Sequence, residues 1–306
     1  MEPVNIPVLK TQKLTIALLV TAPIFSAQAA IIEFNLSAAS STSISGNPTP
    51  VNNTETVTDT PNIESVNAVS YIDDIDNTGI ISNSSFARTQ GGDNGVFGIQ
   101  TNGYGSFDSS AEFLQSYNVK NDALTDQFFD FNFSIENGSL NVGCNDNVIE
   151  SDILIGNDGY GYGGDCNGAA SASYDAEIRL NDVVIWNSMA ELAFNGTDAS
   201  LTPEGNQGTE VLGNYSPQSN YYSWNDQSFI IDLGTFSTNE EFTLDYKVTL
   251  TGAGTNAYSY AQFGDPTGFG LNGSPFTSSN TASVPEPSSL GIIAVGLGLL
   301  GFSRKK

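Results

Sequence analysis

The sequence predicts an all-β protein whose central domain is an antiparallel β-sandwich or jelly roll, with an N-terminal helix before it and a short transmembrane helix after it. Two observations predict the β class. Apolar and polar residues alternate with a period of two over several segments, and turn-forming Gly, Asn and Asp residues separate those segments. In addition, no stretch of the central region shows a sustained helical period. Several antiparallel strands, each with one apolar face, are typical of a sandwich or jelly roll.

Residues 1–29 have the three parts of a secretory signal peptide. Lys10 and Lys13 supply positive charge, an apolar stretch follows over 14–25, and Ala-Gln-Ala at 27–29 matches the small-x-small pattern of a cleavage site. An uncleaved membrane anchor is the alternative, but the apolar stretch is shorter than the ~20 residues that span a bilayer. We therefore expect cleavage after Ala29 and an exported mature chain.

The region between this segment and the sandwich is expected to have little structure. Residues 30–62 are predicted to form a flexible lead-in with one short strand, because most of this stretch is rich in Ser, Thr, Asn and Pro. A single sandwich domain is then expected over 63–275. Residues 276–284, again rich in Ser and Thr, are predicted to be a stalk.

The first clear strand in the domain lies over 129–135, where Phe and Ile alternate with Asp, Asn and Ser. This alternation is typical of a half-buried strand. Asn137-Gly138 follows as a strong turn signal before Leu140 and Val142 resume the pattern. The sequence therefore predicts a turn between two strands at this point.

The second clear segment is 170–180, where apolar residues face one way and Ser, Asp, Glu and Arg face the other. Asn181-Asp182 then predicts a tight hairpin turn into a further strand that begins over 183–186. The same alternation returns over 242–250. These segments are expected to contribute the apolar face of the sandwich.

The end of the chain, residues 285–306, also has three parts. A Pro-Glu-Pro triplet cannot continue a helix, and the apolar, Gly-rich stretch 290–302 after it is predicted to be a short transmembrane helix. The positive-inside rule keeps the final basic cluster in the cytoplasm, which places the domain outside. The triplet is Pro285, Glu286 and Pro287, and the basic cluster is Arg304, Lys305 and Lys306.

This order of parts resembles the PEP-CTERM sorting signal of Gram-negative bacterial envelope proteins, and the resemblance covers 285–306. It implies that an exosortase, a membrane transpeptidase-like enzyme, recognises Pro285, Glu286 and Pro287 and processes the motif. It also implies insertion into the inner membrane through the C-terminal helix before processing, and a final location in the envelope, on the cell surface or outside the cell. Because such tags occur in exopolysaccharide-producing bacteria, exopolysaccharide is an implied partner. An ordinary single-pass tail anchor is the alternative.

The composition excludes several classes of function. The 306 residues include 34 acidic and nine basic side chains and no histidine, and the formal net charge is −25. The absence of histidine removes Ser-His-Asp and Cys-His catalysis and every imidazole metal site. The negative charge argues against nucleic acid as a partner, because phosphate backbones need clustered Lys and Arg.

Cys144 and Cys166 are the only two cysteines. In an exported protein such a pair predicts a disulfide, and closing this loop stabilises the fold by roughly 3 kcal/mol in the chain-entropy model. A redox or metal role is the alternative, but the CxxC spacing and histidine that such sites use are missing.

No cofactor is indicated apart from calcium as a candidate ligand. One acidic cluster over 73–79 begins like an EF-hand loop, but Ser85 stands at the twelfth position counted from Asp74, where the bidentate glutamate belongs. A second cluster lies in the Gly-rich loop 156–165, for which a loop without a ligand is the alternative. The candidate calcium ligands are Asp73, Asp74, Asp76, Asp158 and Asp165.

The sequence favours a non-catalytic envelope or extracellular-matrix protein. A carbohydrate-binding module is the first alternative, in which Tyr221, Tyr222 and Trp224 stack on sugars; their alternative role is to cap the core. A glycoside hydrolase that uses paired carboxylates is the second alternative. No compact signature selects such a pair, because Asp175 and Glu177 lie on an evident strand where they mark its solvent face.

Overall fold

The computed structural model describes residues 29–58, 65–75, 81–92, 97–144, 167–205, 211–264 and 276–279. Within these ranges every regular element is a β-strand, and every strand pair is antiparallel. The predicted all-β, antiparallel class is therefore confirmed. The described part contains no helix long and apolar enough to cross a membrane, and the predicted signal helix and C-terminal helix lie outside the described residues.

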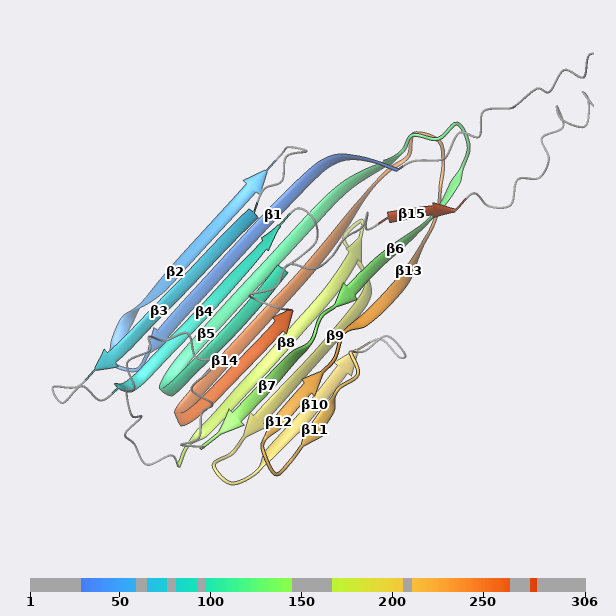
Figure 1. Cartoon of the computed structure of the whole chain (residues 1–306). Coiled ribbons are helices and arrows are strands. Elements are labelled where there is room, and N and C mark those ends of the chain that lie inside the picture. The colour runs from blue at the N-terminus through green and yellow to red at the C-terminus, as the bar shows by residue number, and fades with distance from the viewer. Residues whose placement is uncertain are drawn as a thin grey trace, which may run out of the picture.

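Two strands are much longer than the others, and they form the centre of the molecule (Figure 1). The strands are β1 (Ala29–Ile44), β2 (Asn47–Thr58), β3 (Ser65–Ile75), β4 (Ile81–Gly92), β5 (Phe97–Asn121), β6 (Gln127–Ile135), β7 (Gly138–Gly143), β8 (Ala169–Leu180), β9 (Val183–Phe194), β10 (Ala199–Gly205), β11 (Asn214–Ser216), β12 (Tyr221–Trp224), β13 (Gln227–Phe236), β14 (Glu241–Gly264) and β15 (Phe276–Ser279).

Twelve of these strands belong to one branched sheet that is organised around β5 and β14. One part of the sheet has the order β10-β9-β8-β14-β5-β1-β2. In the other part, β7, β12 and β11 extend from β14, whereas β4 and β3 extend from β5. A separate three-stranded sheet has the order β13-β6-β15.

Both long strands double back on themselves, so the two parts of the sheet face each other. The rings of Phe97 and Phe113, both on β5, have their centroids 4.9 Å apart, whereas a straight strand would separate these positions by about 50 Å. The β5–β14 pairing shifts register at the bend, between Gly254 and Ala257. On β5, Gly103 lies two residues before Gly105, which pairs with Ala257 at the bend. Gly103 packs closely against Phe107, because a Cβ on it would lie 2.2 Å from the Phe107 ring.

The core lies between these two layers, which we call the first layer (β10-β9-β8-β14-β5-β1-β2) and the second layer (β11-β12-β7-β14-β5-β4-β3). Aromatic rings fill it: Tyr174 packs 5.1 Å from Phe263, and Phe97 packs 5.3 Å from Tyr246, measured between ring centroids. The three-stranded sheet adds Phe129, which contacts the same core cluster. The two facing layers are thus parts of one antiparallel sheet that folds over.

The predicted flexible lead-in over 30–62 is wrong where the structure describes it. Residues 29–58 form β1 and β2, which pair along most of their length. The prediction failed because small hydroxyl side chains occupy inward positions of β1. Ser40 is buried, and its Oγ lies 2.8 Å from Oγ of Ser70 on β3 in the facing layer. β1 is therefore a partly buried strand despite its polar composition.

The strand pairing bears on two other expectations. The strands expected on either side of Asn137-Gly138 are present, but they do not pair with each other, because β6 and β7 belong to different sheets and the chain passes between the sheets at this point. The predicted stalk over 276–284 begins with β15, which pairs with β6. In contrast, the hairpin at Asn181-Asp182 is confirmed: these residues have φ values of 49° and 67°, as a type I′ turn requires.

Candidate functional site

The three aromatic residues predicted to bind sugars lie on β12, but only one of them is exposed. Tyr222 and Trp224 are each 3% exposed. The Tyr222 hydroxyl donates a hydrogen bond to the Val211 carbonyl (3.1 Å), and Trp224 Nε1 donates to the Glu136 carbonyl (3.1 Å). These two side chains therefore belong to the core, and only Tyr221, which is 36% exposed, is available for stacking.

A groove runs over β7, β12 and the C-terminal half of β14, and Tyr221 lies in its wall. Its volume is about 1020 Å³. None of the described residues that line it carries a charge, although the chain has 34 acidic side chains. Amide side chains are frequent in the lining, which includes Asn137, Asn141, Gln218, Asn220, Asn225 and Gln262.

The strand register places these side chains on one face of the second layer. On β14, Tyr258, Tyr260 and Gln262 alternate with the buried Ser259 and Ala261. The three outward residues pair with Gly143, Asn141 and Ser139 of β7, in that order. On the far side of β7, Asn141 pairs with Tyr221 and Ser139 pairs with Ser223. Two tyrosines thus flank one asparagine along a single row of the sheet.

Sequence reasoning missed Asn141, Tyr258, Tyr260 and Gln262. The period-two pattern of Tyr, Tyr and Gln over 258–262 is visible in the sequence and identifies three outward side chains on a strand. Their pairing with Asn141 joins segments that are far apart in the chain, and no local pattern specifies it. The sequence alone therefore does not predict the groove.

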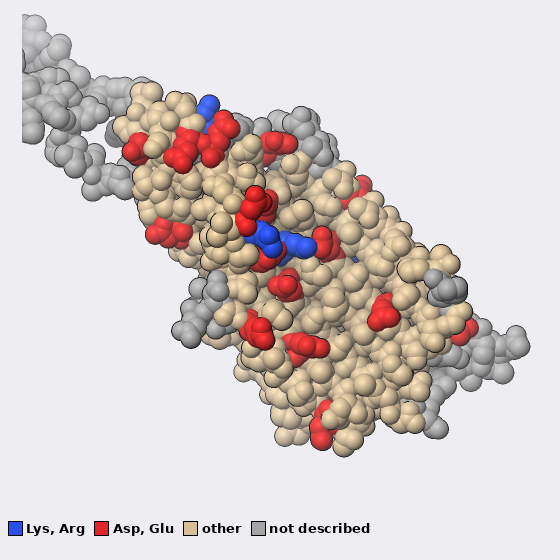
Figure 2. Space-filling model, turned by 180° about the vertical axis from the view of Figure 1, so that it is seen from behind, with Lys and Arg blue, Asp and Glu red and all other residues tan. Residues whose placement is uncertain are grey.

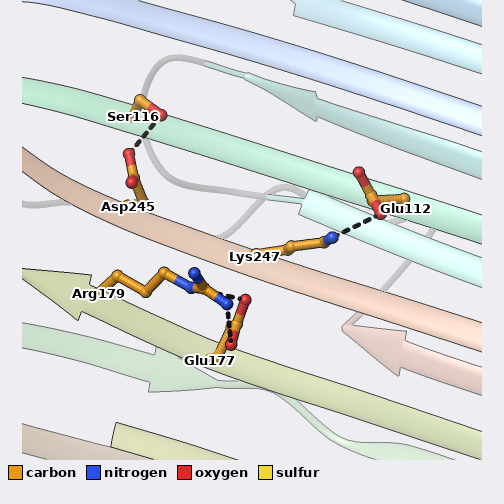
Figure 3. A network of polar contacts seen from close by, with 6 residues as sticks. All are labelled: Glu112, Ser116, Glu177, Arg179, Asp245 and Lys247. Carbon is orange, nitrogen blue, oxygen red and sulfur yellow. Dashed lines mark hydrogen bonds and ion pairs between the residues drawn. The ribbon is translucent and has the colours of Figure 1, made fainter. Parts of the chain in front are cut away.

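Charged side chains gather elsewhere, on the outer face of the first layer. Figure 2 shows basic side chains near the middle of one face with acidic side chains around them. In the close view of Figure 3, Lys247 Nζ lies 2.9 Å from a Glu112 carboxylate oxygen. Arg179 donates two hydrogen bonds to Glu177, at 3.0 and 3.1 Å. These pairs are solvated on a flat sheet, where such interactions contribute little to stability.

The carboxylates considered for hydrolysis belong to this charged face. Asp175 and Glu177 both lie on β8, and Glu177 is held by Arg179. Burial raises the pKa of the Asp175 carboxyl, and repulsion from Glu177 raises it further, whereas Lys247 and Arg179 lower it. The electrostatics are those of a mixed-charge sheet surface, and neither carboxylate is among the described residues that line the groove.

The candidate calcium ligands do not come together in the described structure. Asp73 and Asp74 are neighbours on β3 and therefore face opposite sides of the sheet, and Asp76, Asp158 and Asp165 lie outside the described residues. Burial raises the pKa of Asp73 to about 6. No group of three or more potential metal ligands exists within the described ranges. Calcium binding stays a prediction.

The predicted disulfide also stays a prediction. Cys144 packs against the hydrophobic core directly after β7, and the part of the chain that the structure describes contains no free cysteine. Cys166 lies outside the described residues.

The fold and its surface define an antiparallel all-β domain with an amide-rich groove on one layer, whose described lining carries no charge, and mixed charge on the other layer. At the end of the chain, residues 283–306 match the PEP-CTERM protein-sorting motif. This confirms the resemblance drawn from the Pro-Glu-Pro triplet, the apolar stretch and the basic tail, although these residues lie outside the described ranges. No curated protein and no solved structure matches the chain.

PEP-CTERM motifs are recognised by exosortase-type enzymes. Their presence implies export and membrane anchoring before processing. The chain is therefore a sorted, exported protein, consistent with an exosortase substrate.

Proposed function

We propose that this protein is a non-catalytic component of the cell envelope or extracellular matrix, delivered by its C-terminal motif after export through the N-terminal signal peptide. The match of residues 283–306 to the PEP-CTERM protein-sorting motif carries the proposal. Lys10 and Lys13 at one end and the basic tail at the other leave only four basic residues between 31 and 284. This distribution supports a domain that is translocated while the basic tail stays inside.

The motif acts through its three parts. Proline lacks a backbone N–H and is a poor helix residue, which suits a triplet that the sorting enzyme recognises separately from the apolar stretch. The apolar stretch 290–302 halts translocation, and its shortness relative to the ~20 residues of a permanent span suits a segment that is removed. Processing then releases or transfers the domain, and a matrix role associated with exopolysaccharide follows from the kind of tag.

Two observations support a non-catalytic role. The two carboxylates considered for hydrolysis, Asp175 and Glu177, lie on an open sheet face, and Glu177 is already bound to Arg179. The described lining of the groove contains no histidine, carboxylate or lysine, the side chains that most often act as general acids or bases.

The experiment that tests the proposal compares the full chain in host cells with and without an exosortase. We expect the mature C-terminus, measured by intact mass, to end before Lys306 only when the enzyme is present. Glu286→Ala should abolish processing, whereas the neighbouring Ser288→Ala should leave it unchanged. A full-length species ending in Lys306 in cells that contain the enzyme would overturn processing, and cell fractionation of the same samples tests the envelope location separately.

A further inference from the structure

The groove over β7, β12 and β14 has a chemistry that the sorting motif does not explain. Its described lining combines amides, hydroxyls and tyrosine rings without one charged group. Cation sites in proteins are built mainly on carboxylates, and phosphate sites are built mainly on Lys, Arg or a helix N-terminus. Neither charged class of ligand is matched by these side chains, so the lining fits a neutral ligand.

Amides and hydroxyls both donate and accept hydrogen bonds, as each hydroxyl of a sugar does. Tyr221 adds an aromatic face, which packs against apolar C–H surfaces while its hydroxyl stays polar. Asn141 pairs with Tyr221 across neighbouring strands, so the two positions lie about 5 Å apart. This spacing places an amide beside a stacking surface.

The floor of the groove is rigid before any ligand arrives. Gly138 packs directly on Trp224, because a Cβ at that position would lie 2.3 Å from the indole ring. The indole is fixed in turn by its hydrogen bond to the Glu136 carbonyl (3.1 Å). In the wall, the Asn220 carbonyl accepts a hydrogen bond from the Val142 amide (3.2 Å), which ties the turn before β12 to β7. A preformed site of this kind loses little conformational entropy on binding.

We propose that this groove binds a neutral oligosaccharide, with Tyr221 stacking on a sugar ring and Asn141 and Asn220 bonding to hydroxyls. The volume of about 1020 Å³ lies at the upper end of the range for small-molecule sites, which suits a short chain of sugars. The inference goes beyond the proposed sorting and does not depend on it.

Binding is tested with the purified mature chain on an array that carries neutral cello-, malto- and galacto-oligosaccharides together with oligomers of uronic acids. The best neutral oligosaccharide is then titrated by calorimetry. Tyr221→Ala should weaken binding about tenfold, since it removes one stacking surface. Tyr71→Ala is the matched control, because Tyr71 is 41% exposed on β3, away from the groove, and Tyr221 is 36% exposed.

Asn141→Ala is a second test variant, which removes a hydrogen-bonding group from the groove. Thermal unfolding of all three variants is measured to check that each domain remains folded. Loss of binding in Tyr221→Ala and Asn141→Ala, with Tyr71→Ala unchanged, supports the proposal. Failure to bind any neutral oligosaccharide on the array overturns it, as does binding to uronic acid oligomers alone or an equal loss in the Tyr71 control. None of these outcomes changes the mass of the mature C-terminus, so sorting and sugar binding fail independently.

Discussion

Replacing Tyr246 by Phe should stabilise this protein, although the change removes a polar group. Tyr246 lies on β14 inside the core and is 5% exposed. Its ring packs 5.3 Å from Phe97 and 5.8 Å from Phe133 between centroids. The hydroxyl has no hydrogen-bond partner among the described residues, and burial raises the pKa of this phenol well above its usual range.

The expected gain follows from the hydration that the hydroxyl loses on folding. A buried hydroxyl without a partner costs about 1–3 kcal/mol in proteins, and Phe keeps the ring in the same contacts. Allowing for partial relaxation, we expect the free energy of unfolding to rise by about 1 kcal/mol. Urea unfolding measures this as a higher midpoint with an unchanged slope.

Tyr222→Phe is the matched control, because the Tyr222 hydroxyl donates to the buried Val211 carbonyl (3.1 Å). Its removal leaves that carbonyl unpaired and should lower the free energy of unfolding by about 1–2 kcal/mol. The two variants delete the same atom and should shift the urea midpoint in opposite directions. A Tyr246→Phe protein destabilised as much as Tyr222→Phe would refute the reasoning, since it would mean that Tyr246 has a bonded partner.

Two further predictions concern stability. The folded-state pKa of Asp73 is raised to about 6 from 3.8, so the folded state binds the proton more tightly and the free energy of unfolding should fall as pH rises from about 4 to 6. Asp73→Asn should remove this pH dependence. After allowance for solvent screening of a half-buried group, it should raise the free energy of unfolding above pH 6 by about 1 kcal/mol. Equal melting curves for the two proteins at pH 7 would contradict this prediction. Gly103→Ala should destabilise the bend of β5 by about 1–3 kcal/mol, because its Cβ would overlap the Phe107 ring, and an unchanged urea midpoint would show that the bend relaxes.

The sequence predicts those parts of the fold that depend on neighbouring residues. The β8–β9 hairpin is one example, since the alternation over 170–180 and the Asn181-Asp182 turn lie within one short segment. The doubling back of β5 is the opposite case. Phe97 and Phe113 stack only because a bend brings distant parts of one strand together, and the period-two pattern is the same whether a strand is straight or folded over. Local patterns therefore give the strands but not the layers.

The candidate site was only partly predictable for a related reason. Composition alone does not distinguish a Tyr or Trp that binds sugar from one that fills a core, and this grouped Tyr221 with Tyr222 and Trp224. The alternation along β12 separates them, because Tyr221 and Ser223 point outward while Tyr222 and Trp224 point inward. The alternation along β12 does not predict the role of Asn141, which lies beside Tyr221 because β7 pairs with β12.

The net charge of −25 bears on which polymers can approach the groove. A strongly negative protein repels polyanions over distances of about a Debye length, ~8 Å at physiological ionic strength, and no described lining residue of the groove supplies a compensating cation. Two of the four basic residues between 31 and 284, Arg179 and Lys247, are instead engaged by Glu177 and Glu112 on the other layer. Acidic polysaccharides are thus disfavoured by the field of the whole domain, whereas a neutral chain experiences no such repulsion. We therefore expect the net charge to favour neutral over acidic polysaccharides at the groove, although no charged side chain is among its described lining residues.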